Sequence, residues 1–338
     1  MAEPRVSTTA LTWWHIALAG RCISRPDDYA EPIGQIDLKM SDNGDYMNLR
    51  EFVQLLEQFG HSRRDAGLSW NTGHCKLFDL DQDFGKAILG ARTLGTALHW
   101  LAFYYPLLQD STSARLEIEE DWATFKYRIL DPTIWPRNED AMFTLGIIAL
   151  LIKTAAPDAW VHSSITLEAD AGQLCFDHSA ITQTQVTYGG VDNMLRFPAA
   201  LLDKPLSIAA SGDSSALQRL TRELTQVQRG TPFTLRCRDT IFDEMSNGSV
   251  CQDYVAQQLG VSSRTLRRKL ATEELSFQAL LDECRMQYAA LEFRKRKKQS
   301  LAEMALKLGY SEHSTFSRAF QRWSGMAPHE YRRSVSLH

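Results

Sequence analysis

The sequence predicts two domains: an α+β N-terminal regulatory domain and an all-α C-terminal domain with two helix-turn-helix motifs joined by a long helix. Three observations carry this prediction. The chain has 338 residues, which is room for two domains. The sign of the charge changes near residue 249, and a helix-turn-helix pattern occurs twice after that point. We expect the domains to span residues 1–229 and 230–338.

The charge is divided unevenly along the chain. From residue 250 to the C-terminus there are 15 Lys and Arg against 9 Asp and Glu, whereas the rest of the chain has 22 against 32. The overall net charge of −4 therefore conceals a basic segment attached to an acidic one. Such asymmetry indicates a segment that contacts nucleic acid or a membrane surface, and a solvated basic face is the alternative.

Composition excludes several classes of protein. The 44% hydrophobic and 23% charged residues are typical of a folded globular chain. The longest apolar stretch, residues 142–152, is shorter than the ~20 residues of a membrane-spanning helix, and the N-terminus shows no secretory signal. The six cysteines lie far apart without a CxxC pair, which favours reduced thiols. We therefore expect a cytoplasmic protein with no membrane contact.

The first helix-turn-helix pattern is centred on Gly260. Val255 and Leu259 share one face of a first helix, and Gly260 can adopt the positive φ that ends it. Ser262 is placed to cap the next helix. In a helix-turn-helix motif the first helix braces the second, and the second enters a major groove of DNA.

The second helix of this pattern separates apolar from basic residues. Leu266 and Leu270 fall on one face at i, i+4, which leaves Arg264, Arg267 and Arg268 largely off that face. One such pattern is moderate evidence, because similar turns join ordinary core helices.

The pattern is repeated. Residues 304–311 match residues 255–262 in their apolar, Ala, Gly and Ser positions, and residues 315–320 parallel residues 265–270 after one extra residue. Gly260 and Gly309 lie 49 residues apart. Core packing alone does not account for a duplication of this kind, so the sequence predicts two recognition helices.

A single long helix is predicted between the two copies. Phe277, Leu281, Cys284, Tyr288 and Leu291 follow one another at spacings of four and three, with a serine placed to cap the helix at residue 276. If it separates the recognition helices by ~34 Å, one chain reaches two successive major-groove segments.

Two flanking features complete this prediction. The basic run 294–298, at the end of the connecting helix, is either a solvated face or a set of phosphate contacts. Upstream, Thr231 and Pro232 predict the cap and first residue of another helix, which ends near Met245.

These residues resemble the DNA-binding domain of the AraC/XylS family of bacterial transcription regulators over about 232–333. The resemblance is carried by LAEMA at 301–305, LGYS at 308–311, FSRAF at 316–320, WSGMAP at 323–328 and YR at 331–332. It implies binding to double-stranded promoter DNA and contact with RNA polymerase. The implied DNA-binding positions are Arg264, Thr265, Arg267 and Arg268 in the first recognition helix, and His313, Ser314, Ser317 and Arg318 in the second.

The two recognition helices differ in their chemistry. Arginine can donate two hydrogen bonds to guanine, so Arg264, Arg267 and Arg268 favour a half-site that contains guanine. His313 and Ser314 are shorter and discriminate less. We therefore predict that the first helix carries more sequence discrimination than the second. A phosphate contact, which positions the protein without reading sequence, is the alternative for each arginine.

The N-terminal region has an α+β pattern. We expect helices at 47–59, 85–108, 139–155 and 214–228, a hairpin of strands 114–119 and 123–130, and strands near 160–165 and 194–197. The region contains no GxSxG, GxxxxGK, HExxH or clustered Cys/His motif, and His74-Cys75 reads as packing or surface. We expect neither enzyme activity, nor a catalytic residue, a metal or a cofactor.

The order of several motifs resembles the arabinose-binding-type regulatory domain of one branch of the AraC family. They are RTLGTAL at 92–98, YYPLL at 104–108, LRFP at 195–198 and LLDKPL at 201–206. The resemblance implies a small-molecule effector of unspecified identity and a possible homodimer. The aromatic residues that could line an effector pocket, each of them also a candidate for the core, are Trp13, Trp70, Trp100, Tyr104, Tyr105 and Trp135.

Together these features predict a sequence-specific, effector-controlled transcription regulator. Two other classes stay open. One is a metabolite-binding protein whose helix-turn-helix domain serves mainly protein contacts. The other is an alkyl-transfer DNA-repair protein that uses the same DNA-binding module. The dispersed Cys22, Cys75, Cys175 and Cys237 argue against the tight zinc site that such a repair protein needs.

Overall fold

The computed structural model describes residues 4–7, 46–62, 67, 69–71, 83–170, 178–206, 214–245, 250–295 and 299–335. Its N-terminal domain contains a five-stranded sheet of order β3-β4-β7-β5-β6, in which only the β5–β6 pair is parallel. The strands are β3 (Thr112–Glu119), β4 (Trp122–Ile129), β5 (Ser164–Leu167), β6 (Gln185–Tyr188) and β7 (Asn193–Pro198). A separate two-stranded sheet pairs β1 (Arg5–Ser7) with β2 (Tyr46–Asn48).

The predicted β3–β4 hairpin is confirmed. Its register pairs Glu119 with Trp122, and Glu120 has a positive φ of 53° in the turn. Ala123, Phe125 and Tyr127 are buried on one face of β4, as the alternation of apolar residues predicts. The opposite face of the same strands carries polar and charged residues. This is the face that contacts the C-terminal domain.

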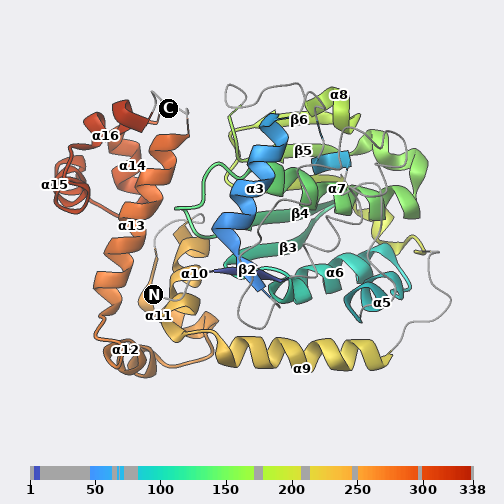
Figure 1. Ribbon diagram of the computed structural model, residues 1–338, viewed down its shortest axis with the longest axis horizontal. Coiled ribbons are helices and arrows are strands. Elements are labelled where there is room, and N and C mark those ends of the chain that lie inside the picture. Colours follow the sequence, from blue (N-terminus) through green and yellow to red (C-terminus); the bar gives the residue numbers. More distant parts are fainter. Residues whose placement is uncertain are drawn as a thin grey trace.

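The helices of this domain lie on and around the apolar face of the sheet (Figure 1). They are α3 (Leu49–Ser62), α5 (Asp83–Leu89), α6 (Leu94–Tyr104), α7 (Asn138–Ala155) and α9 (Ser214–Gly230), with the short α8 (His178–Thr182) beside β6. α6 and α7 pack directly on the sheet, α6 on β3 and α7 on β4 and β7, whereas α3 packs on α7 and α9 packs on α5. The predictions for α3, α7 and α9 are confirmed to within a few residues.

The single helix predicted at 85–108 is wrong, because the chain breaks between α5 and α6. Thr93 caps α6 by accepting a hydrogen bond from the backbone N–H of Thr96 at 3.2 Å. The break is held by tertiary pairing, since Leu94 N donates to Lys204 O at 2.9 Å. Pro106 then begins a 3₁₀ turn that ends α6 at Tyr104. The helical spacing of apolar residues continues across this break, so the sequence predicted one helix.

The strand predicted at 160–165 begins later than expected. Residues Pro157–His162 form a 3₁₀ helix with proline in its first turn, and β5 starts at Ser164. Trp160 is buried, and its indole N–H donates to Thr182 O at 2.9 Å. The strand predicted at 194–197 is confirmed as β7, whereas β1, β2 and β6 are too short to carry a recognisable alternation.

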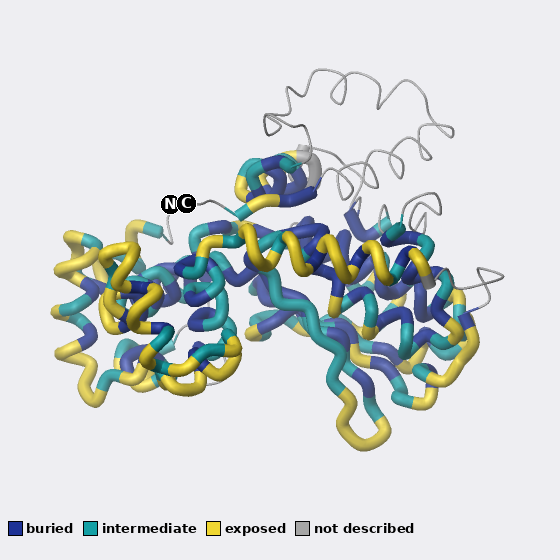
Figure 2. Tube along the Cα trace, turned by 90° about the horizontal axis from the view of Figure 1, so that it is seen from below, coloured by how far each residue is buried: buried dark blue, intermediate teal, exposed yellow. Residues whose placement is uncertain are grey.

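The C-terminal domain is entirely helical in its described part. Its helices are α10 (Phe233–Met245), α11 (Gln252–Gln258), α12 (Ser263–Ala271), α13 (Phe277–Arg294), α14 (Leu301–Lys307), α15 (His313–Ser324) and α16 (Pro328–Val335). They enclose a second hydrophobic core, to which Leu130 of the N-terminal domain also contributes. Figure 2 shows the result as two lobes, each with buried residues inside and exposed turns outside.

The start of α10 differs from the prediction. The Thr231 hydroxyl donates back to Val227 O at 2.8 Å, at the end of α9, instead of capping α10. Pro232 takes the capping position, since its carbonyl accepts the hydrogen bond from Arg236 N at 3.2 Å. The tripeptide 246–248, expected to end this helix, lies outside the described residues.

The cysteines agree with the expectation as far as they can be placed. Among the described residues Cys237 and Cys284 are buried free thiols and Cys251 is exposed. Cys22, Cys75 and Cys175, and His74 with them, lie outside the described residues. The described residues contain neither a cluster of His, Cys, Asp and Glu that could hold a metal ion nor a helix long and apolar enough to cross a membrane.

Candidate DNA-binding surface and interdomain interface

The first helix-turn-helix unit is formed by α11 and α12. Gly260 ends α11 with a φ of +66°, and Val261 N donates to Ala256 O at 2.9 Å across the turn. Ser262 caps α12, because its hydroxyl oxygen accepts a hydrogen bond from Thr265 N at 3.2 Å. The predicted roles of Gly260 and Ser262 are confirmed, and Thr265 lies partly buried in the first turn of α12.

α12 presents its arginines to solvent. Leu266 and Leu270 are fully buried against the core, as predicted. Arg264, Arg267 and Arg268 are exposed on the other side of the helix. The leucines therefore fix the orientation of α12, and the three guanidinium groups share the surface that faces away from the domain.

The second unit, α14 and α15, repeats the turn but not the cap. Gly309 has a φ of +78°, and Tyr310 N donates to Ala305 O at 2.9 Å, matching the first turn. The extra residue places Glu312 at the N-cap, where its side chain makes no capping hydrogen bond to α15. Instead, Ser314 Oγ donates to Glu312 Oε2 at 3.0 Å.

α15 also exposes the positions that sequence reasoning selected. Its buried side is aromatic, with Phe316 and Phe320 fully buried. His313, Ser314 and Arg318 are exposed, and Ser317 is partly buried. The predicted residues thus form two separate exposed groups, one on each recognition helix.

α13 lies between the two units and is packed into both. The apolar residues predicted to form its stripe are buried, namely Phe277, Leu281, Cys284, Tyr288 and Leu291. Ser276 caps the helix by accepting a hydrogen bond from Ala279 N at 3.1 Å. At the other end the Phe293 ring lies 5.3 Å from the Phe320 ring, edge to face.

Sequence reasoning missed an interface between α10 and the N-terminal sheet. Ser111 Oγ donates to Asp239 Oδ2 at 3.1 Å. Asp243 Oδ2 lies 3.1 Å from Arg115 Nη1, and its Oδ1 lies 3.4 Å from Arg128 Nη2. These two arginines lie on the face of β3 and β4 opposite the apolar core, so alternation turns them toward α10. The arginines in the strand pattern were a signal that a polar partner covers this face.

A second interdomain contact holds the end of α13. Glu168, next to β5, accepts hydrogen bonds from Arg137 at 2.8 Å and from Lys295 Nζ at 2.7 Å. All three side chains are buried, with at most 8% of their surface exposed. Burial favours the neutral carboxyl, but the charges of Arg137 and Lys295 outweigh it and hold the pKa of Glu168 at about 2.

This contact corrects the interpretation of the basic run 294–298. Lys295 is neither a solvated surface charge nor a phosphate contact, because it is buried in an ion pair with the N-terminal domain. Residues 296–298 lie outside the described part of the chain. Nothing in the sequence of a basic run indicates which of its lysines is buried.

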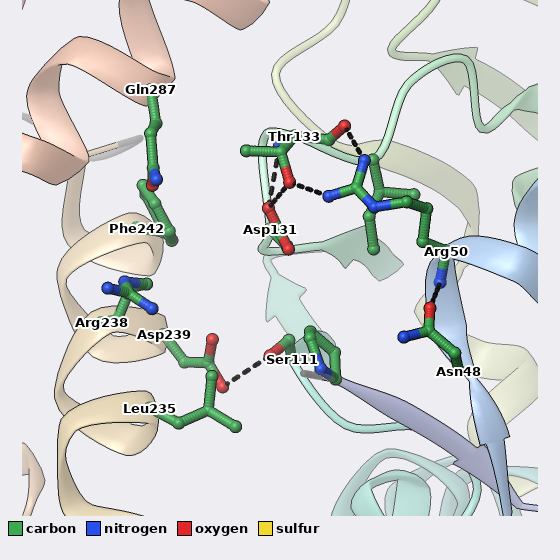
Figure 3. A pocket seen from close by; sticks show the side chains of 12 residues that line it. Asn48, Arg50, Ser111, Asp131, Thr133, Leu235, Arg238, Asp239, Phe242 and Gln287 are labelled. Carbon is green, nitrogen blue, oxygen red and sulfur yellow. Dashed lines mark hydrogen bonds between the residues drawn. The ribbon is translucent and has the colours of Figure 1, made fainter. Parts of the chain in front are cut away.

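A cavity of about 340 Å³ opens at the interdomain interface (Figure 3). One wall comes from the N-terminal domain and includes Asn48, Arg50, Ser111, Asp131 and Thr133. The other comes from α10 and α13 and includes Leu235, Arg238, Asp239, Phe242 and Gln287. Burial raises the pKa of Asp239 to about 8. The hydrogen bond from Ser111 opposes this rise, the charges of Asp110 and Asp131 add to it, and Arg238 opposes it more weakly.

The aromatic candidates for an effector pocket are placed mainly in the core. Trp70, Tyr104 and Tyr105 are buried in the main N-terminal cluster, and Trp100 packs against it. Trp135 instead lies beside the interface, with Lys295 Nζ 5.8 Å from the centre of its ring. Trp13 lies outside the described residues.

Comparison with known families agrees with both domains. Residues 34–206 match the family described as the arabinose-binding domain of AraC transcription regulators, N-terminal, and residues 255–334 match the family described as a helix-turn-helix domain. The first match falls on the α+β domain. The second begins within α11 and extends into α16.

Known relatives are transcription regulators. The HTH-type transcriptional regulator Rv1395 of Mycobacterium tuberculosis is 30% identical over 80% of this chain and 79% of its own length. The ornithine utilization regulator of Pseudomonas aeruginosa is 25% identical over 73% of each chain. The crystal structure of the transcriptional regulator CdpR from Pseudomonas aeruginosa aligns with 95% of this chain and 98% of that one, at 19% identity and a TM-score of 0.42.

Two exposed recognition helices on one all-α domain, an α+β partner domain, and matches to both over most of the sequence lead to one assignment. The chain belongs to the AraC family of transcription regulators, with an arabinose-binding-type N-terminal domain and a helix-turn-helix DNA-binding domain.

Proposed function

We propose that the protein reads two successive major-groove segments of promoter DNA with α12 and α15, under the control of a small-molecule effector. The observation that carries this proposal is the duplicated unit: two recognition helices expose their polar side while buried residues on the other side anchor each in the core of the C-terminal domain. A helix held in this way can present side chains to base edges without rearrangement of its own domain.

The DNA-contacting residues of the first unit are Arg264, Thr265, Arg267 and Arg268. Each exposed arginine can donate two parallel hydrogen bonds to guanine O6 and N7 in the major groove. Thr265 lies in the first turn of α12, and the N-terminal residues of a recognition helix are those that approach base edges.

In the second unit the DNA-contacting residues are His313, Ser314, Ser317 and Arg318. The carboxylate of Glu312 lies at the start of this helix and bonds to Ser314, which reduces the attraction of this helix end for phosphate. The second unit therefore adds contacts with less discrimination than the first.

Effector control requires a ligand that binds two domain arrangements with different affinity. The contacts of Asp239 and Asp243 with the sheet, and of Lys295 with Glu168, hold both units against the N-terminal domain. We place the boundary of the two domains between residues 229 and 230, in the last turn of α9 and ahead of α10. Because one relative is named for ornithine utilization, amino acids belong among the effectors to be tested.

Two further partners follow from membership of this family. We propose that the regulator acts at a promoter together with RNA polymerase, and that the N-terminal domain supports a homodimer. A chain with two reading helices does not need the dimer to bind DNA, so dimerisation would serve to bridge or space two sites.

The test is selection of binding sites from random double-stranded DNA with the full chain, followed by footprinting of the selected sites. We expect two protected segments about 10 base pairs apart, centre to centre, on one face of the duplex. Binding to a single segment would contradict reading by both units. If the full chain selects no sequence even at low salt, the helix-turn-helix domain serves protein contacts instead.

A further inference from the structure

The cavity between the domains has the size and lining of a site for a small metabolite. Its volume of about 340 Å³ lies at the lower end of the range for small-molecule sites. Leu235 and Phe242 supply apolar surface from α10, and Asn48 and Gln287 supply amide groups from opposite walls. A few polar groups around an apolar surface are typical of a pocket that orients its ligand.

Charged groups face one another across this cavity. The N-terminal wall carries Asp131 and Arg50, and the C-terminal wall carries Asp239 and Arg238 (Figure 3). Each wall thus offers one carboxylate and one guanidinium group. A ligand with a single charge would satisfy only half of this set, whereas a ligand with an ammonium and a carboxylate group matches both kinds.

The positions of these side chains are fixed by their neighbours. Asp131 accepts two hydrogen bonds from Thr133 through Oδ1, at 2.8 Å from the backbone N–H and 2.6 Å from the hydroxyl. Arg50 donates from Nη1 to Thr133 O at 2.7 Å and from Nη2 to the Thr133 hydroxyl. Arg238 Nη2 donates to Glu283 Oε1 at 3.1 Å. Because a guanidinium group has five N–H donors, an arginine held in this way can still bind a carboxylate.

We propose that this interdomain cavity is the effector site, and that it takes a small zwitterionic metabolite of the amino-acid class. The ammonium group would lie between Asp131 and Asp239, and the carboxylate would lie toward Arg50 and Arg238. This inference rests on the proposed function, since it assigns a place and a chemical class to the effector.

An ammonium group at this position would change the ionisation of Asp239. Its pKa of about 8 means that the carboxyl is mostly protonated at neutral pH. An ammonium group beside it would favour the ionised form, so ligand binding would release a proton. The charged groups that face this carboxyl from the surrounding elements are Asp110, Asp131, Arg238 and Arg50.

The cavity also explains how a ligand could act on DNA binding. Ser111 and Asp239 already join its two walls by one hydrogen bond of 3.1 Å. A ligand held by both walls would add bonds between α10 and the N-terminal domain. Since α10 packs on α11, α12 and α13, it would favour one position of the first helix-turn-helix unit relative to the sheet.

The experiment is isothermal titration calorimetry on the full chain. The probes are the standard amino acids and 4-aminobutanoate, with butanoate and butylamine as single-charge controls. We expect at least one zwitterionic probe to bind with a Kd below about 1 mM, and to bind at least tenfold more tightly than either control. Titration at pH 7 in two buffers of different ionisation enthalpy should show release of up to one proton.

Variants locate the site. Asp239→Asn and Arg50→Gln, one on each wall, should each weaken binding about tenfold or more, because each removes one charge partner. In Asp239→Asn the proton release should also disappear. Asp282→Asn, a matched change on α13 outside the cavity lining, should leave the Kd unchanged.

The outcomes separate this inference from the proposed function. If the full chain binds its selected DNA but none of the probes, or binds a probe equally well in both cavity variants, the assignment of the cavity is wrong and DNA reading stands. If a probe binds as expected but no DNA sequence is selected, the site stands and the proposed function fails.

Discussion

The two helix-turn-helix units have the same turn geometry but differ in their buried anchoring residues and in their exposed side chains. In the first unit, α12 is anchored by Leu266 and Leu270, and it carries four basic side chains in nine residues. In the second, α15 is anchored by Phe316 and Phe320 and carries two basic side chains in twelve residues. The same backbone geometry is therefore built from different cores and presents different chemistry to DNA.

The units also differ in how the N-terminal domain holds them. The first is contacted through α10, by a hydrogen bond to Asp239 and by ion pairs to Asp243. The second is contacted through Lys295, whose partner Glu168 is buried. The contacts of the first unit thus include the partly exposed Asp243, whereas the second unit is held by an ion pair whose two side chains are both buried.

The largest expected effect comes from removal of that buried anchor. Glu168→Gln removes the buried carboxylate that Arg137 and Lys295 share and leaves Lys295 with Glu292 as its acidic partner, which should lower the free energy of unfolding by about 3 kcal/mol. Urea unfolding of the full chain measures this. The matched change Asp282→Asn breaks a partly exposed ion pair with Arg285 on α13 and should cost at most about 1 kcal/mol. Equal losses in the two variants would show that the buried anchor is not special.

Next in size is the loss of a single recognition arginine. Arg268→Ala should cost about 1–3 kcal/mol on the selected site and relax the base preference at one position. Arg318→Ala on α15 should cost less and leave the preference nearly unchanged. Binding titrations on the selected site and on single-base variants of it measure both effects. An equal loss of preference under α15 would remove the predicted difference between the units.

A smaller effect tests the caps of the two recognition helices. Ser262→Ala removes the hydrogen bond that caps α12 and should lower the free energy of unfolding by about 0.5–2 kcal/mol. Glu312→Ala should change it by no more than about 0.5 kcal/mol, because that side chain makes no capping bond to α15. Urea unfolding measures both, and a larger loss in Glu312→Ala would mean that the second helix depends on its N-cap after all.

A separate test is the response of stability to pH, which has opposite signs in the two contacts. The pKa of Glu168 is about 2, below its ordinary value of 4.5, so its stabilisation is complete above pH 4.5 and is lost as the pH falls toward 2. The pKa of Asp239 is about 8, above its ordinary value of 3.8, so the folded form is favoured at low pH and loses stability as the pH rises from about 4 through 8.

Thermal unfolding from pH 2 to pH 9 checks both signs. Between pH 6 and pH 9 the melting temperature of Asp239→Asn should fall less than that of the unchanged protein, because the variant has no carboxyl to ionise at the interface. Identical slopes for the two proteins would show that Asp239 does not titrate in this range.

Local pattern predicted the helix-turn-helix units well. Gly260, Gly309 and Ser262 act through bonds within a few residues, and the leucines and phenylalanines at i, i+4 are buried as their spacing indicates. The β3–β4 hairpin was predicted for the same reason, because alternation and a short turn are local properties. The break at residues 90–93 was missed because it is held by backbone bonds to residues 204–206, more than a hundred residues away.

At the interface, the arginines of β3 and β4 indicated a polar partner, but the sequence did not show which residues pair there. The pairs Ser111–Asp239 and Glu168–Lys295 are each separated by more than 100 residues in the sequence. The pair Arg137–Glu168 is separated by 31. A buried charge and an exposed charge are the same letter in a sequence, and only the fold decides which of them meets a partner. Lys295, in the middle of a basic run, shows this most clearly.

The sequence by itself determined the two-domain plan, the duplicated recognition helices and the residues they expose, since all of these follow from periodicity and turn chemistry within short segments. The tertiary structure alone decided where the basic domain meets the acidic one, which charges are buried there, and that a cavity lies between them. The physical reason is that burial of charge depends on partners that are distant in sequence, whereas helix and turn formation depends on neighbours.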